Sequence, residues 1–169
     1  MTDKLIMSHE GNYTEARTAK IIRGYFHRTA VKGDTALGEG NYFANNCVKA
    51  SFYKVIDLEG NVIESLPPTD TEWATDNWAE NLDSLSYEFT GLNGTPLTPA
   101  QIHAAIADIN ADPATKTIAK HRLSLVEIKG GHVSGWANHK DVTIAYQTPN
   151  GHVDAISEAE IAQILAGLS

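Results

Sequence analysis

Segments with the patterns of β-strands and of α-helices alternate along the chain, and this order constrains the fold more than any other feature. Short apolar or alternating runs predict strands at residues 21–26, 51–57, 62–66, 84–89 and 123–128. Helix-start signals or apolar stripes predict helices at residues 34–46, 98–112 and 157–168. The turn 59–61 favours a hairpin between the second and third strands, and 130–151 is interpreted only as a glycine-rich passage. The mixture predicts an α/β fold with a single mixed central β-sheet flanked by helices.

The size and charge of the chain limit its domain count and its partners. Its 169 residues suit one domain, and no repeat or linker divides them, so we expect a single domain over residues 1–169. The formal net charge is −8, and the excess lies in residues 61–112, which hold nine acids and neither Lys nor Arg. Nucleic acid is therefore not an expected partner, because binding it requires cations that neutralise phosphates. An anionic membrane surface is disfavoured for the same reason.

The cysteine content and the N-terminal pattern limit the compartment. Cys47 is the single cysteine, which excludes an internal disulfide, and we expect it to be a buried structural thiol. No apolar run reaches about 18 residues, so no membrane span is predicted. Residues 1–7 lack the apolar stretch of a secretory signal, and we therefore expect synthesis in the cytoplasm without a signal peptide.

Three of the seven histidines, His27, His139 and His152, stand out through their neighbours. His27 ends an apolar strand, and His139 begins the run His139-Lys140-Asp141-Val142. Asp154 follows His152 by two residues, so both side chains point the same way if the segment is extended. Two imidazoles and one carboxylate are the ligands of a catalytic type of zinc site, which keeps an open position for water. The residues alone thus allow Zn²⁺ to bind at His27, His139 and Asp154.

Eight segments of the chain, taken in order, match the motifs of a known family. The run from Tyr25 to Ala30 is similar to the strand that carries the family's first metal ligand, and the run from His139 to Val142 is similar to the motif of the second. The remaining matches are residues 12–18, 42–43, 49–60, 71–74 with 77–81, 84–91 and 97–101. Over most of residues 12–155 the chain therefore resembles the zinc-dependent N-acetylmuramoyl-L-alanine amidases of the phage endolysin and peptidoglycan recognition protein type. The resemblance implies the α/β fold of these proteins.

The resemblance also implies roles for individual residues. His27, His139 and Asp154 correspond to the three zinc ligands. Glu88 corresponds to the carboxylate that assists the attacking water, and His152 to the residue that stabilises the oxyanion. Tyr53, Trp73 and Trp78 are expected to wall the substrate groove, with packing in the core as the alternative. The other acids of residues 61–112 are expected to line or border the groove.

The activity implied by the resemblance is hydrolysis of the amide between N-acetylmuramic acid and L-alanine in peptidoglycan. The expected partner is this muropeptide substrate, and the expected oligomeric state is a monomer. The domain would be the catalytic part of a phage endolysin that acts on the bacterial cell wall after holin-type release, and no wall-binding domain is expected in this chain.

Three alternatives remain open. The interval between His139 and Asp154 is longer than usual in the family, so His132 and Asp141 remain alternative third ligands. A non-catalytic peptidoglycan-binding module would have the same fold. A hydrolase with Cys47 as its nucleophile is a third interpretation, which no recognisable cysteine-peptidase motif supports.

Overall fold

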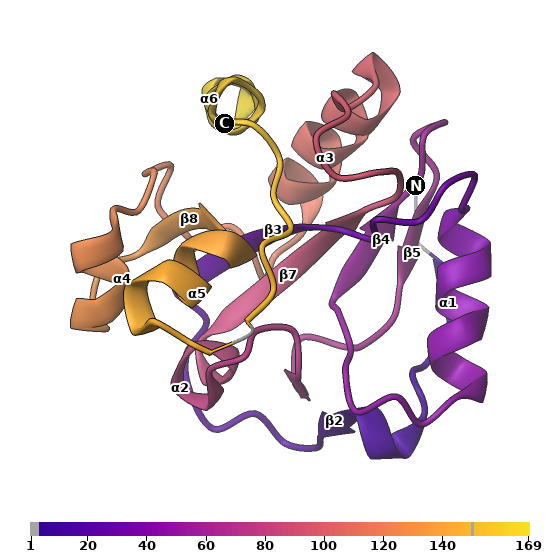
Figure 1. Cartoon of the computed structure of the whole chain (residues 1–169), viewed down its shortest axis with the longest axis horizontal. Helices are drawn as coiled ribbons and strands as arrows, with labels where there is room; N and C mark the ends of the chain where they lie inside the picture. Colours follow the sequence, from indigo (N-terminus) through magenta and orange to yellow (C-terminus); the bar gives the residue numbers. More distant parts are fainter. Residues whose placement is uncertain (1–3, 150) are drawn as a thin grey trace.

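The computed structural model describes residues 4–149 and 151–169, which form a six-stranded sheet with helices on both faces, together with a small two-stranded sheet (Figure 1). No helix in the described ranges is long and apolar enough to cross a membrane. The strands are β1 (Lys4–Leu5), β2 (Tyr13–Thr14), β3 (Arg23–Arg28), β4 (Lys54–Ile56), β5 (Val62–Glu64), β6 (Thr71–Glu72), β7 (Ser84–Phe89) and β8 (Gly135–Asn138). The helices are η1 (Glu10–Asn12), α1 (Ala36–Asn45), α2 (Trp78–Leu82), α3 (Pro99–Ala111), α4 (Leu125–Gly130), α5 (His139–Tyr146) and α6 (Glu158–Gly167).

The large sheet has the strand order β1-β5-β4-β7-β3-β8. The four strands β4, β7, β3 and β8 run parallel, whereas β4 and β5 form the predicted antiparallel hairpin. The mixed sheet confirms the predicted fold class. The strand β3 lies next to the edge strand β8 and pairs with β7 on its other side, and it is buried along its whole length.

Side chains of the central strands alternate between two different environments. Phe26 of β3 and Tyr87 of β7 enter the largest apolar cluster, which α3 and α6 cover on one face of the sheet. Tyr25 belongs to a second cluster with α4 and α5, and Val55 of β4 to a third with α1. The second face thus carries α4 and α5 over one side of the sheet and α1 over the other (Figure 1).

The prediction of a strand at 123–128 is wrong. Ser124 caps a helix there: its hydroxyl accepts the backbone N–H of Glu127, while the Glu127 carboxylate accepts the N–H of Ser124. This capping box starts α4, although the apolar residues that follow also suit a strand. The eighth strand lies further on, at Gly135–Asn138, and α5 follows it directly, both within the passage interpreted only as glycine-rich.

A buried carboxyl group lies between the two sheets. Glu72 of β6 is 1% exposed, and the hydroxyl of Ser86 on β7 donates to its Oε2 at 2.9 Å. Burial raises the pKa of Glu72 from 4.5 to about 7, although Arg17 nearby acts in the opposite direction. Because the folded-state pKa is raised, the stability linked to this group is fully present below about pH 4.5 and is lost as the pH rises through about 7.

Replacing Glu72 by glutamine should remove this loss of stability. The difference in unfolding free energy between Glu72→Gln and wild type should therefore increase in favour of the variant by up to about 3 kcal/mol from pH 4.5 to pH 8. One pKa unit corresponds to about 1.4 kcal/mol. Urea unfolding at both pH values measures the difference. Glu15→Gln at an exposed position is the control. An equal pH dependence in Glu72→Gln and wild type would contradict the prediction.

Candidate metal centre

The ends of two parallel strands bring the two key histidines together. His27 is the penultimate residue of β3, and His139 follows directly on the last residue of β8. Since β3 and β8 are parallel neighbours, their carboxyl ends lie at the same edge of the sheet. Asn138 ends β8 and caps α5, and Asp141 accepts its backbone N–H at 2.8 Å, which closes the first turn of the helix. The imidazole of His139 is therefore held at a strand–helix junction.

Asp154 reaches the same point from the segment between α5 and α6. Two hydrogen bonds join Asn138 to Ile156: its side-chain amide donates to the carbonyl at 3.0 Å, and its side-chain oxygen accepts the N–H at 3.1 Å. The backbone N–H of Arg28 also donates to Asp154 Oδ2 at 3.3 Å. These contacts fasten a segment without regular structure to the ends of β3 and β8.

The three side chains form a compact cluster. Nδ1 of His139 lies 3.0 Å from Oδ1 of Asp154, and Nδ1 of His27 lies 3.3 Å from Oδ2. The two imidazole rings are 4.6 Å apart between centroids. One ligand atom from each of the three residues lies within 4.8 Å of the others. Both histidines are almost completely buried, and Asp154 is 9% exposed.

The donor set and its spacing fit a zinc ion. Tetrahedral zinc with bonds of about 2.0–2.2 Å to nitrogen and oxygen separates neighbouring ligand atoms by about 3.3–3.6 Å. The two nitrogen–oxygen distances, 3.0 and 3.3 Å, come close to this spacing. The Nε2 atoms of both histidines are buried and have no hydrogen-bond partner in residues 4–149 and 151–169. Nδ1 of each histidine faces one oxygen of Asp154, which places the two nitrogens and the carboxylate close together.

A cavity of about 840 Å³ opens over the cluster. Glu88, His152 and Trp73 line it together with the three clustered residues. Glu88 lies on β7 directly beside His27 in the parallel register, so its side chain projects to the same face of the sheet. His152 is exposed, and its ring centroid lies 5.5 Å from that of His139. The residues predicted from the sequence therefore line one cavity, except for Tyr53 and Trp78.

Burial and mutual charge shift the pKa values of these groups. Burial raises the pKa of Glu88 well above its usual range, and the negative charge of Asp154 adds to this effect. Burial also lowers the pKa of His27. For Asp154, burial acts to raise the pKa, but hydrogen bonds with His139 and His27 outweigh it and hold the pKa well below its usual range. Asp154 is thus a carboxylate, the form that binds a metal ion.

Two predicted groove residues do not line the cavity. Tyr53 is 2% exposed, and its hydroxyl donates to Asp112, at the C-terminal end of α3, on the opposite face of the sheet. Trp78 begins α2 and is 52% exposed, outside the cavity lining. Tyr53 packs in the core against α3. The groove role predicted for Tyr53 does not fit this placement. Trp73, by contrast, does line the cavity, and its indole N–H donates to Thr14 at 3.0 Å.

The alternative site residues also lie elsewhere. The carboxylate of Asp141 accepts hydrogen bonds from the Asn138 backbone and from Arg122, and His132 is exposed, so neither belongs to the metal cluster. Cys47 follows the end of α1 and is exposed, so the expectation of a buried thiol is wrong. It is also absent from the cavity lining, which removes the support for a cysteine nucleophile there.

Three of the nine acids of residues 61–112 pair with buried cations. Asp108 and Asp112 pair with the buried Lys54, and Glu80 pairs with the buried Arg23. Among the nine acids, Asp76 and Glu88 line the cavity. The expectation that the whole stretch borders the groove is therefore wrong, because buried cations recruit these carboxylates.

Three further acids of the cavity carry no sequence motif. Asp34 and Glu39 lie at the α1 side, where burial, together with a hydrogen bond and repulsion from Asp34, raises the pKa of Glu39 to about 8. Asp76 precedes α2 and lies 3.7 Å from Nε2 of His139. No periodicity or spacing indicated these residues, since their proximity to the site arises from the tertiary fold.

Comparisons with known proteins identify the fold. No protein-family model and no curated protein sequence matches the chain. The hydrolase AmiA of Staphylococcus aureus, solved in complex with its ligand, matches with a TM-score of 0.71 at 14% identity, over 99% of this chain and 82% of its own. The N-acetylmuramoyl-L-alanine amidase LysC from Clostridium intestinale gives 0.54 at 15%, covering 98% and 99%, and a mutant endolysin from Bacillus subtilis gives 0.64 at 15%, covering 99% and 100%. The chain has the fold of the N-acetylmuramoyl-L-alanine amidases and endolysins, as the sequence motifs implied.

Proposed function

We propose that the protein is a zinc-dependent amidase that hydrolyses the bond between N-acetylmuramic acid and L-alanine in peptidoglycan. The observation that carries the proposal is the cluster of His27, His139 and Asp154 at the base of a large cavity. The similarity in fold to an N-acetylmuramoyl-L-alanine amidase adds support for the substrate class. Loss of one ligand would instead favour a module that only binds peptidoglycan, but all three ligands are present.

Each residue of the cavity then has a chemical task. His27, His139 and Asp154 would hold the zinc ion, which would supply a Lewis acid that lowers the pKa of a water and polarises the lactyl carbonyl. Glu88 takes the proton of the attacking water on its carboxylate and passes it to the nitrogen of L-alanine as the carbon–nitrogen bond breaks.

His152 and Trp73 have supporting tasks at the cavity wall. His152 donates a hydrogen bond to the oxygen on which negative charge develops in the tetrahedral intermediate. Trp73 presents an indole face on which a sugar or peptide group packs. We further propose that the chain acts as a monomer, as the catalytic domain of a phage endolysin made in the cytoplasm and released to the wall with the help of a holin.

The direct test uses the purified chain, zinc and purified peptidoglycan. We expect about one zinc ion per chain and a time-dependent increase in free N-terminal L-alanine without release of reducing sugar ends. Treatment with a chelator should stop the reaction, and added zinc should restore it. Retained binding to peptidoglycan without any newly formed L-alanine amino groups would favour the non-catalytic module.

Replacing His152 by alanine should lower kcat by about 10²-fold, the usual effect of removing one donor to an oxyanion. The zinc content should stay unchanged, because His152 is outside the ligand cluster. The measurement is the initial rate at saturating peptidoglycan fragments, alongside metal analysis. His103→Ala, at an exposed position of α3, is the matched control. An unchanged kcat in His152→Ala would remove this residue from the mechanism.

A further inference from the structure

One carboxylate of the cavity contacts both of the segments that carry the site. Oδ2 of Asp76 accepts the backbone N–H of His152 at 3.0 Å, and the same oxygen lies 3.7 Å from Nε2 of His139. The second separation is that of an ion pair and is longer than a hydrogen bond. Asp76 thus stands between α5, which carries His139, and the segment that carries His152 and Asp154.

The two nitrogens of His139 face different partners. Nδ1 faces Asp154 and hence the point at which the ligand atoms converge. Nε2 is buried and has no hydrogen-bond partner in residues 4–149 and 151–169, and the Asp76 carboxylate lies 3.7 Å from it. A histidine that binds a metal through one nitrogen usually donates the other N–H to a carboxylate or carbonyl, which fixes the tautomer and the ring orientation.

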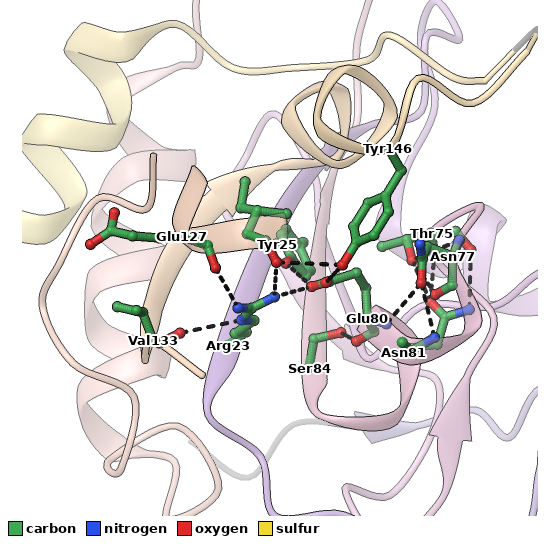
Figure 2. A network of polar contacts seen from close by, with 12 residues as sticks. Arg23, Tyr25, Thr75, Asn77, Glu80, Asn81, Ser84, Glu127, Val133 and Tyr146 are labelled. Atoms are coloured by element: carbon green, nitrogen blue, oxygen red, sulfur yellow. Dashed lines mark hydrogen bonds and ion pairs between the residues drawn. The ribbon is translucent and has the colours of Figure 1, made fainter. Parts of the chain in front are cut away.

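The loop that carries Asp76 is itself fixed by hydrogen bonds. The side-chain oxygen of Asn81 accepts both the backbone N–H and the hydroxyl of Thr75 at 2.8 Å, and its amide donates back to the Thr75 carbonyl at 3.1 Å. On the other side of Asp76, Asn77 caps α2 by accepting the N–H groups of Ala79 and Glu80. Both neighbours of Asp76 are therefore held, as Figure 2 shows for Thr75, Asn77 and Asn81.

A buried network then joins α2 to the helix that carries His139. Glu80 of α2 is 2% exposed and pairs with Arg23 of β3, and it also accepts the hydroxyl of Tyr25. Tyr146, near the end of α5, donates its hydroxyl to the other oxygen of Glu80 at 2.8 Å (Figure 2). α2 and α5 are thus fixed relative to each other at one end by Glu80, while Asp76 faces His139 at the beginning of α5.

We propose that Asp76 is a positioning residue that orients the His139 imidazole for zinc and holds the 152–154 segment in place. This inference rests on the proposed zinc-dependent function. The negative charge of Asp76, 3.7 Å from Nε2, favours a proton on that nitrogen, so that the Nδ1 lone pair is free for the metal. The hydrogen bond from the His152 backbone to Asp76 holds the segment that carries Asp154. Asp76 does not itself bind the metal.

The experiment measures zinc affinity by competition with a chromophoric chelator. Asp76→Ala should bind zinc about 10–100-fold more weakly than wild type, the usual effect of removing the partner of a ligand histidine. Asp76→Asn keeps an acceptor oxygen and should recover most of the affinity. Asp70→Asn is the matched control, since Asp70 also accepts a backbone N–H, that of Ala16, but lies outside the cavity. Thermal unfolding of the metal-free proteins verifies that each variant is folded.

Cobalt substitution separates positioning from direct ligation. The visible absorption of Co²⁺ bound to Asp76→Ala should keep the band shape and intensity of wild type once the site is saturated, because the ligand set is unchanged. A changed band would show Asp76 to be a ligand and overturn the inference, as would an unchanged zinc affinity in folded Asp76→Ala. A wild-type chain that binds no zinc would instead overturn the proposed function, and this inference with it.

Discussion

Replacing His139 by alanine should abolish zinc binding at the cluster and lower peptidoglycan hydrolysis by more than about 10³-fold, because metal activation of water and carbonyl contributes several kcal/mol and each 1.4 kcal/mol is a factor of ten. The imidazole is buried between His27 and Asp154, so alanine leaves two ligands and an open side to the cavity. Metal analysis of the dialysed protein and the rate of L-alanine release measure the two losses.

The matched control for this variant is His132→Ala, because His132 is an exposed histidine outside the cluster. It should keep the zinc content and the rate of wild type. Wild type stripped by a chelator should have the same residual rate as His139→Ala. A His139→Ala protein that retains one zinc ion and full activity would refute the assignment of the metal centre.

Replacing Glu88 by glutamine should lower kcat by about 10²–10⁴-fold, which is the usual contribution of a general acid–base group. Glutamine has nearly the same shape, so the cavity and the zinc content should be unchanged, but it cannot take the proton from water. Glu88 lies directly beside His27 in the sheet and lines the cavity, which gives its carboxylate access to a water at the cluster. Initial rates at saturating substrate, with zinc content in parallel, give the result.

Glu59→Gln at an exposed position in the turn after β4 serves as the control for the loss of one negative charge. It should leave both kcat and the zinc content unaltered. A Glu88→Gln protein with the kcat of wild type would require another proton acceptor. In that case Glu39, also at the cavity wall, would be the next carboxylate to replace.

The fold was predictable where a local pattern determines the structure. The alternation of Leu85, Tyr87 and Phe89 with polar residues matches the two faces of β7, and Thr98 with Pro99 begins α3 as expected. The helix at Leu125–Gly130 was not predictable in this way, because its side chains also suit a strand and the capping box decides. β8 has four residues, and its place in the sheet depends on pairing with β3 rather than on its own sequence.

The candidate site divides in the same manner. The motifs around His27 and His139 indicated two members of the candidate metal cluster, and Asp154, two residues after His152, is the third. Asp76, in contrast, belongs to no motif. Tyr53 was predicted to line the groove, but it packs in the core on the opposite face of the sheet. Both residues show that proximity across the sheet arises from the packing of distant segments, which a linear pattern does not contain.

The position of β3 between β7 and β8 also has a consequence for biosynthesis. β3 lies early in the chain, yet both of its neighbours, β7 and β8, are translated much later. A nascent polypeptide must therefore keep at least one edge of this strand, which is buried in the folded protein, unpaired until Asn138 has left the ribosome. Unpaired strand edges favour aggregation. Non-local parallel pairing also slows folding. The yield of folded protein should therefore depend on translation speed and temperature more than the modest size of the chain suggests.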